Sequence, residues 1–203
     1  MQIGKVIGTL VSTHAGELIA SHLPFLLVSE SGPHGTLRGH MARANPQWQS
    51  FEKGQDVLAI FQGPHAYVCP AWYEEPLSVP TWNYATVHAY GVPSLIEERE
   101  ALYRLLEALV RVHEAPMPYP WPFELPDDYV GRMINGIVGF EIRLTRLEGK
   151  LKLSQNRSLA DQQAVADALL KQGDPRGVEL AELMTQTGNL QRSVKAGTQL
   201  AED

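Results

Sequence analysis

Short runs of alternating apolar and polar residues fill the first ~90 residues of the chain, and turns rich in Gly and Pro separate them. Pro24 is expected to bend one of these strands, because proline cannot donate a hydrogen bond to an interior ladder. Many short antiparallel strands with one inserted helix predict a small β-barrel and not a parallel sheet. The predicted strands are Lys5 to Ser12, Glu17 to Val28, Gly35 to Met41, Asp56 to Gln62, His65 to Pro70 (after a break at Gly63-Pro64) and Thr81 to Val92.

The hydrophobic period changes to that of helices after Glu97. Leucines from Leu102 to Leu109 recur on one face, which predicts an amphipathic helix from Glu97 to His113. The segment from Ala115 to Pro126 holds five prolines and three aromatic residues, and we expect a stiff loop that packs its aromatics. The later predicted elements are a helix that Asp127 or Asp128 caps and that ends at Asn135, a strand from Val138 to Leu144, and helices that begin after Ser158 and Asp174 and end near Gln172 and Gly188.

The 203 residues, of which 44% are hydrophobic, can bury the core of one domain with appendages. We expect residues 1–157 to form the barrel domain and residues 158–203 a helical appendage with a frayed tail from Asn189. No segment is long and apolar enough to cross a membrane, and the N-terminus lacks the features of a signal peptide. The lone Cys69 excludes an internal disulfide framework and a multi-cysteine zinc site within one chain. These features predict a cytoplasmic protein.

The segment from Gly39 to Trp48, G-H-M-A-R-A-N-P-Q-W, is suited to binding an anion. The formal net charge of −6 argues against a generally basic surface for nucleic acid, so a bound anion would need local cations. Asn45 is a favourable N-cap, Pro46 suits the first helical turn, and Gly54 is expected to end the helix. Arg43 precedes this cap, and an arginine beside a helix N-terminus is suited to phosphate. An ordinary strand-to-helix joint with a solvated arginine explains the segment equally well by itself.

Two further segments carry polar or aromatic clusters. The segment from Gly149 to Arg157 holds three cations and three neutral hydrogen-bonding side chains between a strand and a capped helix. Such a set suits a polyoxygen ligand that carries phosphate, and a solvated basic loop is the alternative. Trp82 and Tyr84 could stack on a planar ring while Asn83 contacts its polar edge. Ordinary core or interface aromatics are the alternative for these residues.

The remaining polar residues match no known catalytic or metal-binding spacing. The seven histidines show no H-E-x-x-H or comparable pattern, and we expect no metal site. The serines lack the G-x-S-x-G context of a nucleophile elbow, and the chain contains neither a Walker A loop nor a G-x-G-x-x-G motif. Catalytic residues therefore stay unassigned. His22 and His88 are the candidates for an acid or base, and a structural role explains each of them better.

Five blocks of the sequence, taken together and in order, closely resemble the PaiB family, whose members are described as FMN-binding negative transcriptional regulators. The resemblance covers the chain from about Gly8 to Arg157. It implies the FMN-binding split β-barrel, a fold shared with pyridoxamine-phosphate oxidases and usually built as a homodimer. The blocks are Thr9 to Pro24, Gly39 to Trp48, Ile60 to Tyr73, Val79 to Gly91 and Gly139 to Arg157.

The resemblance also implies which residues bind the cofactor. One set would line the flavin and grip its phosphate, a second would approach the ring or its edge, and a third would reach the site late in the chain, from the same or the partner subunit. Family members generally carry a helical lead-in before T-L-V-S-T, whereas the sequence here begins eight residues before that motif. If the lead-in covers part of the flavin or dimer surface, we expect FMN affinity to be reduced or altered here. The three sets are Ser21, His22, His40, Arg43 and Asn45; Trp82 and Asn83; and Lys152, Ser154, Gln155 and Arg157.

Three functions fit these observations. The first is a dimeric FMN-binding regulator. Its direct binding to DNA is not supported by charge, because the helices between Ser158 and Gly188 contain only Lys171 and Arg176 as cations and no helix-turn-helix signature is evident. Regulation through a protein partner or a small metabolite is therefore expected. The alternatives are a flavin-dependent oxidoreductase of the split-barrel superfamily that acts on a small molecule, and a module that has lost its cofactor.

Overall fold

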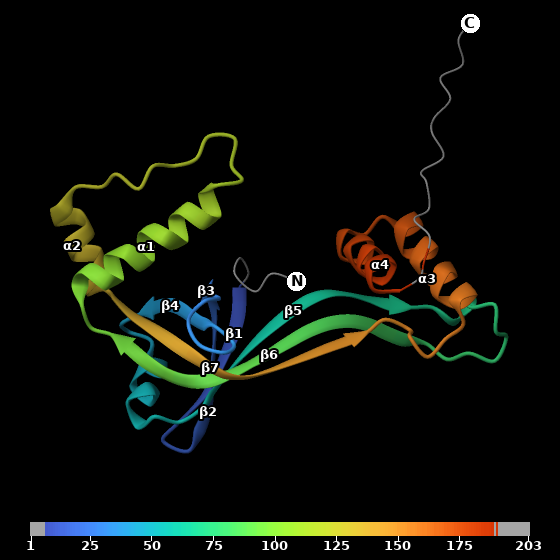
Figure 1. The fold of residues 1–203 in the computed structure, drawn as a ribbon, viewed down its shortest axis with the longest axis horizontal. Helices are drawn as coiled ribbons and strands as arrows, with labels where there is room; N and C mark the ends of the chain where they lie inside the picture. The colour runs from blue at the N-terminus through green and yellow to red at the C-terminus, as the bar shows by residue number, and fades with distance from the viewer. Residues whose placement is uncertain (1–6, 189, 191–203) are drawn as a thin grey trace, which may run out of the picture. The chain divides into compact units, whose positions relative to one another are not determined.

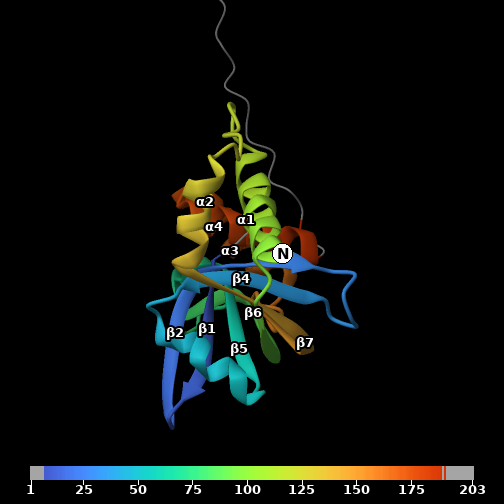
Figure 2. The same cartoon turned by 90° about the vertical axis from the view of Figure 1, so that its left-hand side faces the viewer.

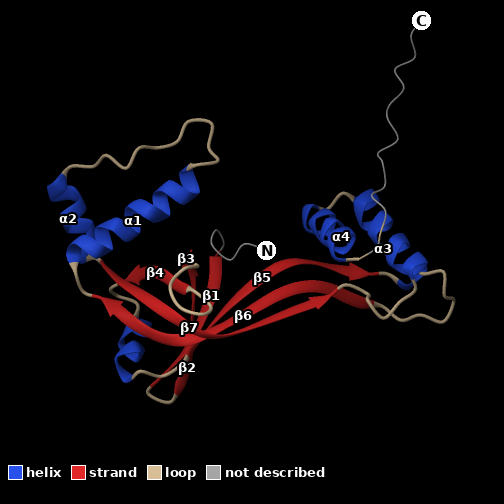
Figure 3. Cartoon of the chain, in the orientation of Figure 1, coloured by secondary structure: helices blue, strands red, loops and turns tan. Residues whose placement is uncertain are grey.

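A seven-stranded antiparallel sheet with strand order β2-β1-β5-β6-β7-β4-β3 forms the centre of the fold (Figure 1). The computed structural model describes residues 7–188 and 190. Strands and helices are distinguished by colour in Figure 3. The strands are β1 (Ile7–His14), β2 (Glu17–Pro24), β3 (Leu26–Val28), β4 (Thr36–Ala42), β5 (Val57–Val68), β6 (Thr81–Ile96) and β7 (Ile137–Lys152). The helices are the 3₁₀ helices η2 (Pro46–Lys53) and η3 (Pro70–Trp72), and α1 (Arg99–Glu114), α2 (Asp127–Asn135), α3 (Leu159–Gln172) and α4 (Pro175–Thr187).

Local sequence signals placed most of these elements correctly. The predicted bend at Pro24 is confirmed, because β2 ends there and β3 starts two residues later. Ala15 and Gly16, both with positive φ, form the two-residue turn between β1 and β2, which is the geometry that matches strand twist in hairpins. The predicted frayed tail, except for residue 190, lies outside the described residues, as do the first two residues of the first predicted strand.

The predicted break at Gly63-Pro64 is wrong, because β5 runs through both residues. The described pairing of β5 with β1 covers Leu58 to Ile60, so Pro64 lies beyond it. On the side that faces β1, Pro64 therefore interrupts no described ladder hydrogen bond, so the strand can continue through it. The predicted cap of α2 is also wrong: Pro126 is the N-cap, and the helix already includes Asp127.

The structure divides into two compact units, Met1–Gln62 with Thr86–Gly149, and Gly63–Ala85 with Lys150–Asp203. Strands β5, β6 and β7 contribute residues to both. The division at Arg157 that the sequence suggested stays a prediction. No helix in the described ranges is long and apolar enough to span a membrane.

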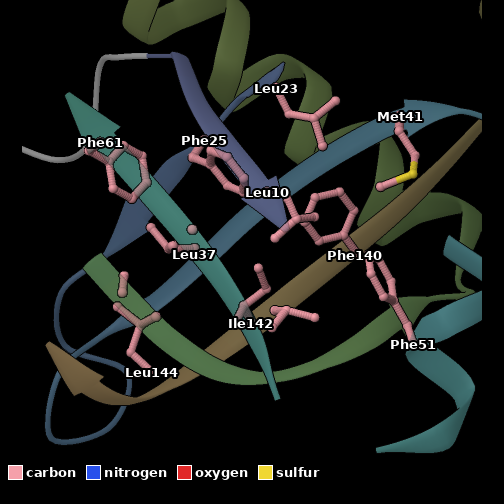
Figure 4. Close-up of a cluster of buried hydrophobic side chains, with 13 residues drawn as sticks. Leu10, Leu23, Phe25, Leu37, Met41, Phe51, Phe61, Phe140, Ile142 and Leu144 are labelled. Carbon is pink, nitrogen blue, oxygen red and sulfur yellow. The ribbon is translucent and has the colours of Figure 1, made fainter. Parts of the chain in front are cut away.

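Aromatic side chains fill the core of the first unit (Figure 4). The ring of Phe25 meets those of Phe61 and Phe140 edge-on, with centroids 5.5 and 6.1 Å apart. Phe51 of η2 packs on Phe140 at 5.3 Å. Each ring buries a large apolar area, and edge-on contacts add to that stabilisation. The packing of Phe51 fixes η2, and with it the joint between β4 and η2, on the sheet.

Helices α1 and α2 lie side by side over β4 in the first unit, as Figure 2 shows. Their facing residues form a separate apolar cluster with Leu26, Ile96 and Ile137 of the strands. The amphipathic helix predicted from Glu97 to His113 is thereby confirmed as α1. In the second unit, α3 and α4 pack on the ends of the strands through a third cluster, which includes Val68, Leu153, Val165, Leu180 and Met184.

Candidate functional site

The joint between β4 and η2, residues 43–45, ends with the predicted N-cap, Asn45. The Oδ1 atom of Asn45 accepts a hydrogen bond of 2.9 Å from the backbone N–H of Gln47, and Pro46 stands in the first turn. Gly54 ends the helix with a left-handed φ of 61°. These three predictions are confirmed, although the helix is of the 3₁₀ type. The cap satisfies one of the orphan N–H groups that every helix start exposes.

Asn45 and Ser21, two of the predicted cofactor residues, contact each other directly. The Nδ2 atom of Asn45 donates a hydrogen bond of 2.8 Å to the Oγ atom of Ser21 on β2. Both side chains are half-buried. The Asn45 amide therefore serves the joint with both of its ends, as a helix cap and as a tie to β2.

A buried polar network beneath the joint was missed by the sequence reasoning. The Nε2 atom of fully buried Gln47 lies 3.0 Å from the carbonyl of Leu10 and 3.3 Å from that of Ile19, so it ties η2 to β1 and β2. The hydroxyls of Ser12 and Ser50 join the network, whereas the Oε1 atom of Gln47 is buried without a partner among the described residues. Gln47 stands three residues before buried Ser50, and in a 3₁₀ helix that spacing puts both side chains on one face, which was the signal that could have placed Gln47 inside.

Arg43 is bound to the end of α2 and is not a freely solvated arginine. Its Nε and Nη2 atoms donate hydrogen bonds of 2.9 Å each to the carbonyls of Asn135 and Ile137. Its own carbonyl accepts a hydrogen bond of 3.0 Å from Nε1 of Trp48. A guanidinium carries five N–H donors, so three remain beyond the two that these carbonyls use. Because the side chain is exposed, those donors can reach an anion.

His40 and His22 lie on the strands beside the joint. His40 is half-buried on β4, and its Nδ1 atom is a buried polar atom without a partner in the described structure. Burial lowers the pKa of His40 below its ordinary value of 6.5, so the ring is neutral near pH 7. His22 is exposed on β2, opposite Thr9 of β1. The unsatisfied Nδ1 atom is of the kind that a bound polar ligand completes.

Asn83 and Ser154 form a buried pair in the second unit. Asn83 Nδ2 lies 2.9 Å from Ser154 Oγ, and that hydroxyl lies 3.3 Å from Asn83 Oδ1. Ser154 has a left-handed φ of 62°, which is uncommon for a residue with a side chain. Gln155 holds the same turn, because its side chain bonds the backbone of Leu153 and Leu151 at 2.7 and 2.8 Å. In the structure, the side chains of Asn83, Ser154 and Gln155 therefore stabilise the loop through these hydrogen bonds.

Lys152 and Arg157 are the cations of this loop that carry polar neighbours. The Nζ atom of Lys152 donates to the hydroxyl of Thr81. The Arg157 guanidinium stacks over the ring of Tyr73, 4.4 Å from its centroid, and donates to Ser78 Oγ at 3.3 Å. Cations with adjacent hydroxyls are a suitable donor set for a phosphate group.

Trp82 presents an open aromatic surface in the second unit. Its side chain is 53% exposed. The ring of Tyr67 meets the Trp82 ring edge-on, with centroids 6.0 Å apart, and the centroid of the His65 ring lies 6.3 Å from that of Trp82. The prediction that Trp82 stacks on a planar ligand stays a prediction, and the exposure leaves room for such stacking. Among the described residues, no group of three or more His, Cys, Asp or Glu side chains could hold a metal ion.

A family model described as "Putative FMN-binding domain" matches residues 4–146. The chain is 40% identical over 178 residues to "Protease synthase and sporulation protein PAI 2" of Bacillus subtilis (strain 168), which covers 87% of this chain and 84% of that protein. It is 32% identical over 219 residues to an uncharacterized protein of Aspergillus fumigatus, with 85% and 84% covered. The family match contains the joint and Trp82, whereas Lys152 to Arg157 lie beyond it.

Two solved structures support the fold at low sequence identity. The flavocytochrome Anf3 from Azotobacter vinelandii matches with a TM-score of 0.55 and 13% identity, over 73% of this chain and 63% of that chain. A conserved hypothetical protein from Mycobacterium tuberculosis matches with a TM-score of 0.54 and 16% identity, over 77% and 83%. The predicted fold class, an antiparallel split β-barrel of the FMN-binding type with C-terminal helices, is confirmed.

Proposed function

The chain belongs to the PaiB-like family that carries the "Putative FMN-binding domain", and from this membership we propose that it is a dimeric, cytoplasmic FMN-binding regulator. Arg43 carries the proposal, because its three remaining N–H donors are exposed beside the capped start of η2. The name of the Bacillus subtilis relative connects that protein with protease synthesis and sporulation, which favours a regulatory role over a metabolic one.

The side chains at the joint fit the groups of FMN. The remaining guanidinium edge of Arg43 would bind the phosphate, and the unpartnered Nδ1 atom of His40 would exchange a hydrogen bond with the ligand. Lys152 and Arg157 are a second set suited to phosphate or ribityl oxygens, from either subunit of the proposed dimer. When bound, FMN supplies electron transfer at its isoalloxazine ring.

Charge favours an indirect mode of regulation. The formal net charge is −6, and α3 and α4 contain only Lys171 and Arg176 as cations. A DNA-binding face needs clustered Lys and Arg side chains. The proposed regulator therefore acts through a protein partner or a small metabolite.

A flavin titration tests the proposal. Purified protein should show the visible absorption of flavin or gain it on addition of FMN, and size-exclusion chromatography with light scattering should show a dimer. Arg43→Ala should weaken FMN binding by about 1–3 kcal/mol if the guanidinium contacts the phosphate. Arg111→Ala on α1 is the matched control, because Arg111 is an exposed cation paired with Glu107. A wild-type protein that neither contains nor binds FMN would contradict the proposal.

A flavin-dependent oxidoreductase is the second candidate, which the open surface of Trp82 and Tyr67 favours. Such a surface can stack a planar substrate. FMN-loaded protein that consumes NAD(P)H steadily would support this function. If Trp82→Ala left such a turnover unchanged, Trp82 would not take part in it.

A further inference from the structure

We propose that Arg43 couples anion binding at the β4–η2 joint to the order of helix α2, and that a bound FMN phosphate thereby stabilises the end of that helix. The inference rests on the proposed FMN binding. It adds a second role to Arg43, that of a positioning residue for α2. The coupling would give an FMN-binding regulator a structural output that needs no DNA-binding face.

Arg43 contacts three consecutive residues where α2 ends and β7 begins. Its backbone N–H donates to the carbonyl of Gly136 at 2.8 Å. Its side chain donates to the carbonyls of Asn135 and Ile137 on either side, at 2.9 Å each. One residue of the joint thus satisfies the carbonyls at which α2 ends and β7 begins.

Helix α2 depends on such anchors for its stability. It has nine residues, and its N-cap, Pro126, makes no side-chain capping bond. Isolated helices of this length are unstable in water, so α2 is held by tertiary contacts. Val130 and Ile134 pack on the leucines of α1. The carbonyl end of a helix is also partly negative, which makes the guanidinium of Arg43 a favourable partner there.

The guanidinium has the geometry to bind α2 and an anion together. Its Nε and Nη2 atoms face the carbonyls, which leaves the edge formed by Nη1 and the second Nη2 proton. Arginine binds phosphate through two parallel N–H groups of one edge. An anion on the remaining edge would restrict the side chain to the rotamer that also bonds Asn135 and Ile137. By linkage, an ordered α2 raises the affinity of the joint for the anion by the same factor.

Lysine at position 43 should separate the two roles. It keeps the positive charge that attracts phosphate, but it lacks the planar fork that bonds two carbonyls and an anion at fixed angles. Arg38→Lys is the matched control. Arg38 lies on the same strand, and its bond of 3.2 Å goes to Glu141 and not to α2.

Hydrogen exchange read by mass spectrometry tests the coupling in the full chain, with FMN as the probe and FMN binding followed by absorbance in the same samples. In the wild type and in Arg38→Lys, FMN should slow exchange of the amides from 130 to 138 by about fivefold or more. In Arg43→Lys, these amides should exchange faster without FMN and show no further change with it. A purely structural role would give the faster exchange in the variant without any FMN effect in the wild type.

The failures are distinguishable. If the wild type binds FMN and exchange in α2 does not change, the coupling is overturned and the proposed function stands. If the wild type binds no FMN, both are overturned. The wild-type comparison decides the coupling even when Arg43→Lys folds poorly.

Discussion

The Nδ2 atom of Asn45 donates a hydrogen bond of 2.8 Å to the Oγ atom of Ser21, which lies 24 residues earlier in the chain. The other end of the same amide caps η2 through Gln47. One side chain therefore fixes the start of η2 and its distance from β2. Since Arg43 precedes Asn45 by two residues, the same bonds position the proposed anion site.

Two substitutions of Asn45 should differ in stability. Asn45→Ala loses the cap and the bond to Ser21, which should lower the free energy of unfolding by about 2–3 kcal/mol. Asn45→Asp keeps a capping oxygen and replaces the amide donor with a carboxylate oxygen, to which the Ser21 hydroxyl can donate instead, so the loss should be at most about 1 kcal/mol. Urea denaturation measures both, with Ser21→Ala as the control for the lost bond. Equal losses in the two variants would show that the bond to Ser21, and not the cap, dominates.

Local signals predicted the helix starts because capping depends on a few adjacent residues. Asn45, Ser158 and Asp174 all cap the helices that the sequence assigned to them. The alternation of apolar residues likewise predicted the barrel, since burial of one sheet face imposes a period of two. The strand break predicted at Pro64 is wrong because the free-energy cost of a proline in a strand depends on whether a neighbouring strand pairs with that residue.

Partners far apart in the sequence could not be predicted in this way. The carbonyl of Asn135 that Arg43 binds lies 92 residues away, and Asn83 and Ser154 are 71 residues apart. Sequence patterning shows that these side chains are polar, but the fold decides whether a backbone carbonyl or solvent meets them. The joint was therefore predicted as a structure, whereas the hydrogen bonds from Arg43 to the carbonyls of Asn135 and Ile137 became visible only in three dimensions.

Gly91 should tolerate no side chain. A Cβ atom there would lie 2.2 Å from the backbone oxygen of Arg143 on β7 and 2.9 Å from the Cγ2 atom of Ile142. Because the first of these atoms belongs to the backbone, Gly91→Ala should destabilise the protein by about 3 kcal/mol through separation of β6 and β7. Gly149→Ala is the control, since no atom lies within 4 Å of its added Cβ. Thermal unfolding of the two variants decides, and similar melting temperatures would contradict the packing argument.

Ser154 and Asn83 should be energetically coupled. Ser154→Ala leaves the buried Asn83 amide without its hydroxyl partner and should cost about 1–3 kcal/mol, most of which should vanish in an Asn83→Ala background. Ser154→Gly loses the same bond but removes the left-handed strain, so it should be about 1 kcal/mol more stable than Ser154→Ala. A double-mutant cycle by urea denaturation measures the coupling. Additive losses would show that the two side chains do not stabilise each other.

His40 should make the stability of the protein depend on pH. Burial lowers the pKa of His40 in the folded state, so the unfolded chain binds its proton more readily. Stability from this residue is therefore complete above the unfolded pKa of 6.5 and decreases as the pH falls through that value toward the folded pKa. His40→Gln should lose less stability than the wild type between about pH 7.5 and about pH 5.5. Urea midpoints at the two pH values measure the difference, and His22→Gln controls for the removal of an exposed histidine. An identical decrease in the wild type and His40→Gln would show that other groups cause the acid sensitivity.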